Sequence, residues 1–378
     1  MNKGILFCNK TLQYCFGLLL SGVLIVFLMV FFPNHSNAEP LIYAENYQMH
    51  SKNTQSNRQY SVRLPKNYEK NSSSNYPVIY FMAGQWSMLP GVAVMDTIED
   101  DLPEFIIVGV HSKGDDHAPI KDEKGNQNSE AKAFSDFFYN ELIPKIESEY
   151  RVADYKILSG YSGSARFVLH SLLDKSSRFN AYFAFSPSLE SYIFNRRFKT
   201  QLEDKKWLSN SSKRSVYITM SSEGSHMQEP FEALSSLLNE ERAGAKYTLR
   251  RYPDETHSSY MLLGLIFALR DLFDGWVPSW SVRKKGLSGL QYFYKELSEK
   301  YGFDVKISSH VVYQTIFALY RSETALHHLK ASELVDFQLA NNSNYREKID
   351  SLNYQLKEYG FLKASKRLEN HLKSIDRM

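Results

Sequence analysis

The chain has 378 residues, of which 43% are hydrophobic and 14% aromatic, and its formal net charge at pH 7 is only +3. This composition excludes a disordered chain and suits one large hydrophobic core plus a smaller unit. Basic and acidic residues are interspersed along the chain, so we expect no nucleic-acid partner.

The N-terminus has the pattern of a targeting segment. Two lysines in the first ten residues precede an almost unbroken apolar run over residues 16–32, and small residues follow at 36–38. This order predicts a cleaved signal peptide over residues 1–38 and a periplasmic or secreted bacterial protein. The alternative is an inner-membrane anchor over residues 13–32, and only in that case do we expect the chain to contact a membrane.

Both cysteines of the chain, Cys8 and Cys15, lie inside this N-terminal segment. If the segment is cleaved, the mature protein contains no cysteine. An exported protein of this kind would owe none of its stability to disulfide bonds.

Several segments of the central region have the patterns of buried strands. Residues 60–64 alternate between apolar and polar side chains, which is typical of a half-buried strand. Continuous apolar runs, typical of strands covered on both faces, lie at 77–82 and 105–110, and further strands are expected at 157–161, 216–220 and 247–252.

Helical patterns alternate with these strands, at residues 133–149, 167–173 and 260–273. Such alternation predicts an α/β domain with a mostly parallel central sheet over residues 40–280. Ligands of open α/β sheets bind at the carboxyl ends of the strands, so we expect the functional residues on the loops there.

Residues 285–378 lack strand patterns and predict a small all-helical C-terminal domain. Five helices are expected, at 290–301, 310–320, 324–339, 345–359 and 362–375. The string Leu-Lys-Ala-Ser occurs at 329–332 and again at 362–365, close to the period of tetratricopeptide repeats. We therefore hypothesise a tetratricopeptide-like extension that could recruit a protein partner.

The most informative motif is Gly160-Tyr161-Ser162-Gly163-Ser164, at the end of one predicted strand and the start of a helix. It is nearly the Gly-x-Ser-x-Gly nucleophile elbow, with Ser164 at the position of the second glycine. A serine hydroxyl is a poor nucleophile unless a base takes its proton and N–H groups hold the oxyanion. Ser162 is therefore the candidate nucleophile.

The candidate base is His257, because it follows the last predicted strand and precedes an apolar helix. The candidate acid is Glu223, which follows the preceding strand at the same edge of the sheet. Asp254 and Glu255 are alternatives, although residues so near His257 on one loop rarely orient its ring. A Ser–His pair without a strong third member is a further alternative.

Two backbone N–H groups are expected to form an oxyanion hole, that of Gly163 and that of Gln85, which follows the strand at 77–82. We expect no cofactor and no metal. The histidines that could suggest a metal, His111, His117 and His226, have none of the usual ligand spacings.

Taken together, these segments resemble the "putative esterase" family of α/β-hydrolases, which includes esterase D, the antigen 85 mycolyltransferases and the siderophore esterases. The resemblance covers about residues 58–275 and rests on the strings at 61–68, 76–84, 105–110, 134–150, 160–164, 179–180 and 186–189.

The resemblance implies an α/β-hydrolase fold and the same roles for Ser162, His257, Glu223, Gln85 and Gly163. Two departures are the residues Ser164-Ala165, where the family commonly has glycines, and the loop at 113–119, which lacks the usual arginine. Some family members also carry a helical extension, which residues 285–378 resemble in abbreviated form.

The sequence thus predicts an exported serine esterase that cleaves a small-molecule or cell-envelope ester through an acyl-enzyme on Ser162. One alternative is an acyltransferase that uses the same site. Another is a non-catalytic α/β-hydrolase-fold binding module whose helical tail recruits a partner.

Overall fold

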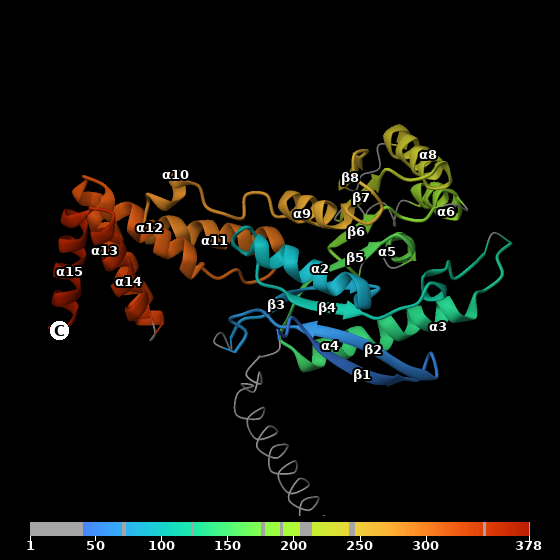
Figure 1. Cartoon of the computed structure of the whole chain (residues 1–378), viewed down its shortest axis with the longest axis horizontal. Helices are drawn as coiled ribbons and strands as arrows, with labels where there is room; N and C mark the ends of the chain where they lie inside the picture. Colours follow the sequence, from blue (N-terminus) through green and yellow to red (C-terminus); the bar gives the residue numbers. More distant parts are fainter. Residues whose placement is uncertain are drawn as a thin grey trace, which may run out of the picture. The chain divides into compact units, whose positions relative to one another are not determined.

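The computed structural model describes residues 41–69, 73–122, 124–174, 178–189, 192–204, 214–241, 246–342 and 345–377. From Tyr43 onward they belong to one compact unit. Its centre is an eight-stranded sheet in the order β1-β2-β4-β3-β5-β6-β7-β8 (Figure 1). The strands are β1 (Glu45–Ser51), β2 (Ser56–Arg63), β3 (Tyr76–Met82), β4 (Ile106–Val110), β5 (Val152–Tyr161), β6 (Ala181–Phe185), β7 (Ser215–Ser221) and β8 (Lys246–Tyr252).

Most neighbouring strands of the sheet are parallel. β1 and β2 form an antiparallel hairpin, and β2 is also antiparallel to β4. All pairs from β4 to β8 across the sheet are parallel, which confirms the mostly parallel sheet predicted from the continuous apolar runs. The loops that follow β3, β5, β6, β7 and β8 therefore meet at one edge.

Side chains of the central strands alternate between two hydrophobic clusters, one on each face of the sheet. On β3, Ile79 and Phe81 belong to one cluster, and Val78 and Tyr80 belong to the other. Since both faces are covered by helices, apolar residues are favoured at every position of the strand.

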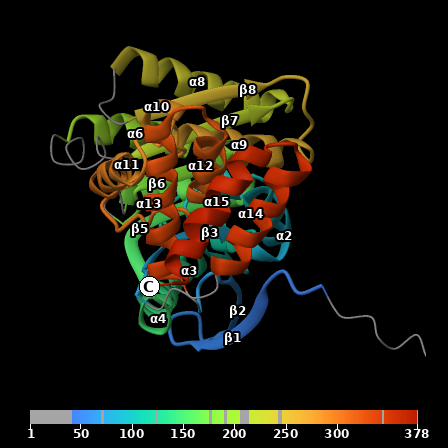
Figure 2. The ribbon, with the colours of Figure 1, turned by 90° about the vertical axis from the view of Figure 1, so that its left-hand side faces the viewer.

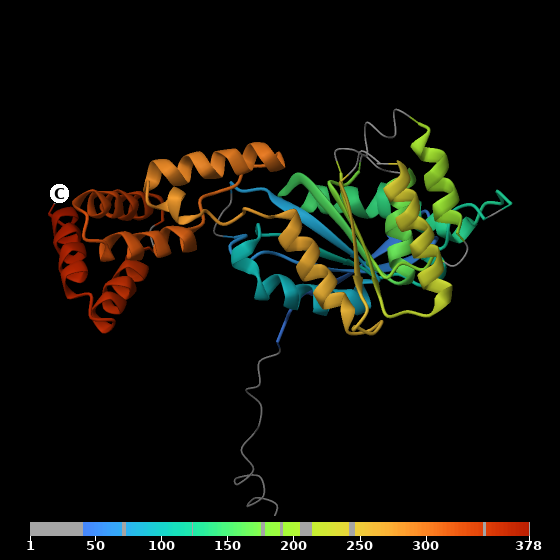
Figure 3. The ribbon, with the colours of Figure 1, turned by 90° about the horizontal axis from the view of Figure 1, so that it is seen from above.

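Two helices cover one face, and the remaining helices of the α/β region cover the other (Figure 3). On the first face lie α2 (Gly84–Thr97) and α9 (Tyr260–Leu272). On the second face lie α3 (Ser129–Phe137), α4 (Ile143–Glu149), α5 (Gly163–Asp174), α6 (Ile193–Leu202) and α8 (Ser225–Glu241).

The structure corrects one predicted helix. The segment predicted as a single helix over residues 133–149 consists of α3, a π-helical turn at Phe138–Leu142, and α4. Pro144, which has no N–H to donate, lies directly after the π-turn within this continuous helical backbone. The helical pattern is present, but the π-turn shifts which side chains face the sheet.

The C-terminal region is helical, as predicted. It contains α10 (Trp280–Arg283), α11 (Leu287–Tyr301), α12 (Ser309–Arg321), α13 (Ala325–Asn341), α14 (Tyr345–Glu358) and α15 (Leu362–Ile375). Figure 2 shows α12 to α15 lying side by side, and their buried side chains join the same hydrophobic cluster as α2 and α9. The domain boundary near residue 280 stays a prediction.

The two copies of the Leu-Lys-Ala-Ser string occupy similar positions on α13 and α15. Ser332 is hydrogen-bonded to Tyr320 of the preceding helix, and Ser365 donates to Asn353 of the preceding helix. Both partners precede the serine by 12 residues. The tetratricopeptide assignment itself stays a prediction.

The predicted targeting segment, residues 1–38, lies outside the described residues, and so does the alternative anchor over 13–32. Among the helices that the structure describes, none combines the length and apolar character that a membrane crossing requires.

Candidate active site

Ser162 lies at the turn between β5 and α5, at the carboxyl edge of the sheet. Its φ angle is 57°, a left-handed conformation that is rare for residues other than glycine. The turn is closed by hydrogen bonds from the Ser162 N–H to the Phe185 carbonyl at 2.9 Å and from the Ala165 N–H to the Ser162 carbonyl at 3.1 Å. This strained backbone is the conformation that a nucleophile elbow requires.

Gly160 allows this turn to form. A Cβ atom at Gly160 would lie 2.5 Å from the carbonyl oxygen of Ser164, so no larger residue fits between β5 and the first turn of α5. A glycine in the motif is therefore explained by the close approach of two backbones.

Ser164, which departs from the usual glycine, has a structural role in the elbow. Its buried hydroxyl accepts a hydrogen bond from the Tyr161 N–H at 2.8 Å and donates one to the Tyr161 carbonyl at 2.8 Å. The serine thus satisfies two backbone groups of the last residue of β5. The departure from the family pattern is compatible with an intact elbow.

Glu223 and His257 are brought together from the loops after β7 and β8. His257 Nδ1 lies 2.5 Å from Glu223 Oε1, across 34 residues of sequence. Because an ionised carboxylate only accepts hydrogen bonds, Nδ1 carries the proton, and Nε2 of a neutral ring is left with its lone pair. The His257 ring also packs against the ring of Tyr161, with centroids 4.8 Å apart, and Tyr161 directly precedes Ser162 in the sequence.

The environment of Glu223 favours its ionised form. Burial by itself raises the pKa of this carboxyl, but hydrogen bonds from Ser221 and His257 outweigh burial, and the pKa lies below its ordinary value. The Ser221 hydroxyl donates to Glu223 Oε1 at 2.5 Å and lies 3.0 Å from the Ser186 hydroxyl, which can donate to it in turn. Glu223 is therefore an ionised, oriented partner for His257 at neutral pH.

The structure brings neither alternative acid to His257. The carboxylate of Glu255 accepts a hydrogen bond from the Ser259 hydroxyl at 2.7 Å. Asp254 is exposed and has no described contact with the ring of His257. Of the three candidate acids, Glu223 has the hydrogen bond that a catalytic acid would need.

Gln85 and Gly163 lie in the first turns of α2 and α5. The first N–H groups of a helix have no partner within the helix, and they carry the positive end of its dipole. Ala83, just before α2, has a φ angle of 55°, so strained backbone occurs after β3 as well as after β5. Both predicted oxyanion donors thus lie at helix starts, which suits the role, and the oxyanion hole itself stays a prediction.

A hydrogen-bond network that the sequence analysis did not identify holds the turn before α2. The Ser112 hydroxyl accepts from the Ala83 N–H at 3.0 Å and lies 2.7 Å from His117 Nε2. The side-chain amide of Gln85 donates to the Ser112 carbonyl at 2.6 Å and accepts from the Ser112 N–H at 3.2 Å. The network therefore positions the strained turn that presents the Gln85 N–H.

His117 is the buried member of this network. Burial is the main cause that lowers its pKa to about 4, so the ring is neutral at physiological pH. Its loop is anchored by a partly buried ion pair between Arg58 and Asp116 at 2.6 Å and by Arg166, which donates to the His117 carbonyl at 3.1 Å. This is the loop that lacks the family's usual arginine.

The histidines considered for a metal site have other contacts. His111 Nε2 lies 2.9 Å from the Ser61 hydroxyl, and His117 contacts Ser112. Within the ranges that the structure describes, no three histidine, cysteine or acidic side chains form a group that could hold a metal ion. The expectation of a metal-free site stays a prediction.

Comparisons with known proteins identify the family and the fold of the chain. A family model described as "Putative esterase" matches residues 51–260, more than half of the chain. An IroE-like serine hydrolase from Shewanella oneidensis is 23% identical over 77% of this chain and 98% of that chain, with a TM-score of 0.62. The BES protein from Bacillus cereus is 24% identical over 63% of this chain and 98% of that chain, with a TM-score of 0.52.

A third solved structure, an uncharacterised protein from Capnocytophaga ochracea, is 14% identical over 82% of this chain and 93% of that chain, with a TM-score of 0.59. No curated protein matches the chain. At such identities the structures show the fold alone, and they confirm the predicted α/β-hydrolase fold.

Proposed function

Since the chain belongs to the "putative esterase" family, we propose that it is a serine esterase that hydrolyses a carboxylic ester through an acyl-enzyme on Ser162. The observation that carries the proposal is the hydrogen bond between Glu223 and His257, whose ring packs against Tyr161 at the base of the elbow. Loops after the parallel strands β5, β7 and β8 supply these groups, as in an α/β-hydrolase fold.

In the first half-reaction, the Ser162 hydroxyl attacks the ester carbonyl while His257 Nε2 takes its proton. The carbonyl oxygen becomes an oxyanion, which the N–H groups of Gln85 and Gly163 stabilise; one such donor contributes about 3 kcal/mol to transition-state stabilisation. His257 then returns the proton to the leaving alkoxide, and the alcohol departs. The negative charge of Glu223 stabilises the imidazolium that forms in between.

In the second half-reaction, water gives a proton to His257 and attacks the acyl-enzyme, which releases the acid and restores Ser162. The side chain of His257 is 39% exposed, so solvent water reaches the base. The same exposure admits an alcohol acceptor as well as water. Product analysis in the presence of alcohol acceptors separates the two reactions.

The experiment that tests this proposal combines labelling with substitution. A fluorophosphonate probe should modify Ser162 covalently, and Ser162→Ala should lose labelling and at least 10³-fold of its activity on aryl esters, an order-of-magnitude expectation. Unchanged activity in Ser162→Ala, with a melting temperature equal to wild type, would refute the proposal. An unlabelled wild-type protein with no ester hydrolysis would instead support a binding module.

We also propose that the chain is exported, on the basis of the apolar N-terminal pattern. Mass spectrometry of the mature protein from a bacterial host tests this proposal. A chain that begins at Glu39 in a periplasmic or culture fraction agrees with cleavage after residue 38. Retention of the intact N-terminus in the membrane fraction would favour the anchor over residues 13–32.

A further inference from the structure

The two N–H groups proposed to bind the oxyanion lie on separate helices. Gln85 lies on α2, which follows β3, and Gly163 lies on α5, which follows the neighbouring strand β5. The start of α2 packs on the strand on the other side of β3, because a Cβ atom at Gly84 would lie 2.4 Å from the backbone of Gly109 on β4. Since two donors must point at one oxygen atom, the site needs a contact that fixes the distance between these helix starts.

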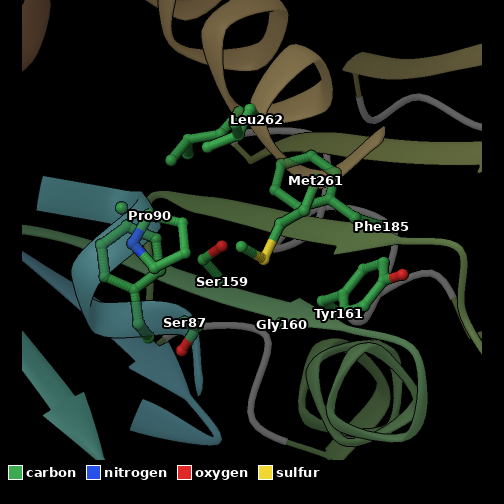
Figure 4. A pocket seen from close by; sticks show the side chains of 11 residues that line it. Ser87, Pro90, Ser159, Gly160, Tyr161, Phe185, Met261 and Leu262 are labelled. Atoms are coloured by element: carbon green, nitrogen blue, oxygen red, sulfur yellow. The ribbon is translucent and has the colours of Figure 1, made fainter. Parts of the chain in front are cut away.

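Packing between α2 and the end of β5 leaves this distance open on one side. A small space, with room for about one water molecule, lies there between Ser87 of α2 and the strand end Gly160-Tyr161 (Figure 4). The hydroxyl of Ser87 lies 2.9 Å from the Met82 carbonyl and 3.0 Å from the Ala83 carbonyl, so its proton is engaged within its own turn. On this side, the start of α2 therefore faces a space instead of packing directly on the elbow.

The loop that follows β4 contacts both helix starts. The Ser112 hydroxyl accepts a hydrogen bond from the Ala83 N–H at 3.0 Å and lies 2.7 Å from His117 Nε2. The His117 carbonyl accepts a hydrogen bond from Arg166, in the first turn of α5, at 3.1 Å. The ring of His117 also lies beside Gly163, since a Cβ atom there would be 3.9 Å from His117 Nδ1. His117 therefore contacts the turn before α2 through Ser112 and contacts the start of α5 directly.

The hydrogen bonds of Ser112 define which form of His117 suits this contact. A hydroxyl has one proton to donate, and Ser112 Oγ lies 2.7 Å from His117 Nε2 and 3.5 Å from the Val110 carbonyl. The shorter distance favours donation to Nε2, which leaves a lone pair of the hydroxyl for the Ala83 N–H. Nε2 accepts only in a neutral ring, and burial, the main cause that lowers the pKa of His117 to about 4, keeps the ring neutral at physiological pH.

The ring of His117 is held among aromatic side chains. His117 is 4% exposed, and its ring centroid lies 6.1 Å from that of Phe134 on α3 and 6.4 Å from that of Phe167 on α5. The ion pair between Arg58 and Asp116 anchors the loop just before it. The ring therefore has a fixed place in the fold, and its surroundings are chemically compatible with a phenyl ring.

We propose that His117 is a positioning residue that joins the start of α2 to the start of α5 and so fixes the distance between the Gln85 and Gly163 N–H groups. The proposal rests on the esterase function of Ser162, and it assigns to His117 no contact with the substrate. A displaced α2 turn weakens the binding of the oxyanion more than the binding of the uncharged ester. Loss of the His117 contact should therefore lower kcat and leave KM nearly unchanged.

The test compares two substitutions of His117 with p-nitrophenyl butyrate as the substrate. His117→Phe keeps an aromatic ring but has no acceptor for the Ser112 hydroxyl, so kcat should fall roughly ten- to a hundredfold, with KM within about twofold of wild type. His117→Gln keeps an acceptor oxygen near the position of Nε2, so kcat should stay within about threefold of wild type. A residue that only packs would give the opposite order, because phenylalanine replaces the packing better than glutamine does.

A trifluoromethyl ketone gives a second measurement. The Ser162 hydroxyl adds to the ketone carbonyl, its proton goes to His257, and the carbonyl oxygen becomes an oxyanion in the proposed hole. The inhibition constant should therefore rise in His117→Phe by about the factor by which kcat/KM falls. Ser112→Ala should give a similar loss, and the double variant little further loss, because two residues that act through one contact are not additive.

His170→Phe is the matched control. His170 is also a buried histidine, on α5, but its Nδ1 lies 2.9 Å from Arg197 Nη1 and its ring packs against Phe194. This variant should keep kcat and the inhibition constant of wild type, whatever its effect on the melting temperature. Ser112→Ala keeps the test decisive if His117→Phe does not fold.

Three results would overturn the inference alone, with ester hydrolysis by the wild-type protein intact. They are an unchanged kcat in folded His117→Phe or Ser112→Ala, a rise in KM without a fall in kcat, and losses that multiply in the double variant. A wild-type protein that neither hydrolyses esters nor reacts with a fluorophosphonate at Ser162 would overturn the esterase function and the inference together.

Discussion

The two ends of β5 contribute to different regions of the molecule. At its carboxyl end, Ser162 and Ser164 belong to an elbow built from strained backbone and directional hydrogen bonds. Near its amino end, Tyr155 packs against the rings of Tyr301 and Phe273, which lie on α11 and just after α9. About 23 Å of extended strand separates Tyr155 from Ser162.

This comparison indicates how the chain separates chemistry from stability. Hydrogen bonds at the carboxyl edge lose most of their interaction energy when the angle at the donor hydrogen changes by a few tens of degrees. Aromatic packing tolerates small displacements and stabilises the fold mainly through the apolar area that it buries. We therefore expect substitutions at the carboxyl edge to change activity more than stability, and substitutions near the amino end to do the reverse.

The largest expected effect is on activity, from Glu223→Gln. The glutamine keeps the size of the side chain but removes the charge that stabilises the imidazolium and selects the tautomer with a proton on Nδ1. We expect kcat for aryl esters to fall on the order of 10³-fold or more, with little change in the melting temperature.

Glu255→Gln is the matched control, because Glu255 lies two residues before His257 and its carboxylate contacts Ser259 instead. Steady-state kinetics of the two purified variants test the comparison. If Glu255→Gln loses activity and Glu223→Gln keeps it, the acid has been assigned to the wrong loop.

The largest expected effect on stability comes from Tyr301→Ala. Tyr301 is 7% exposed, packs against Phe273, Trp276 and Tyr155, and donates a hydrogen bond to the Leu272 carbonyl at 3.1 Å. Truncation of such a buried aromatic residue should lower the free energy of unfolding by about 3–5 kcal/mol. We expect kcat/KM to stay within about twofold of wild type below the melting temperature, because the site is remote.

Tyr292, which is 67% exposed on the same helix, provides the control. Tyr292→Ala should change the free energy of unfolding by no more than about 0.5 kcal/mol. Urea titration followed by circular dichroism measures both variants. A loss of activity in folded Tyr301→Ala would show that the helical region and the active site are coupled.

The sequence was sufficient to place Ser162, Glu223 and His257 after three strands of one sheet. Each of these residues follows a predicted strand, and parallel strands end at the same edge, so local patterns determine their neighbourhood. Local patterns do not determine which side chains of neighbouring strands contact one another. The contact between Ser186 and Ser221 depends on the pairing of β6 with β7, and the sequence analysis did not recognise β6 as a strand.

The helix α2 was missed for a related reason. Its sequence contains Gly84, Gly91 and Pro90, residues that disfavour helices, and its apolar residues face both the sheet and α9. Tertiary packing overrides this weak propensity. The contact between α2 and α9 depends on where both helices lie on the sheet, so no pattern within either segment predicts it.

A third prediction concerns pH, because His117 is a buried neutral histidine beside the proposed oxyanion turn. Burial chiefly lowers its pKa to about 4, the charges of Arg166 and Arg58 add to this effect, and Asp116 opposes it. Below about pH 6.5 the unfolded chain binds a proton on His117 that the folded chain does not bind. The free energy of unfolding should therefore fall as the pH decreases from about 6.5 to 4, by up to about 3 kcal/mol.

His117→Gln should remove this share of the pH dependence, while its amide can still bond to the Ser112 hydroxyl. Urea unfolding near pH 7 and near pH 4.5 measures the difference in the wild type and in the variant. His50→Gln, at an exposed histidine, is the matched control. The idea fails if His117→Gln shows the same loss of stability on acidification as the wild type and the control.

The smallest expected effect tests whether Ser164 compensates for the missing glycine of the elbow. In Ser164→Ala, the N–H and carbonyl of Tyr161 each lose a partner at the end of β5. We expect a loss of about 1–2 kcal/mol in the free energy of unfolding and a severalfold decrease in kcat, because the displaced turn carries both Ser162 and the Gly163 N–H.

Ser148→Ala is the control: it removes a hydrogen bond from the Ser148 hydroxyl to the Lys145 carbonyl at an exposed helix end. This variant should change neither the free energy of unfolding nor kcat measurably. If Ser164→Ala matches this control in stability and in kcat, Ser164 does not support the elbow, and the strained backbone at Ser162 is held by its own backbone hydrogen bonds to Phe185, Ala165, Arg166 and Ser188.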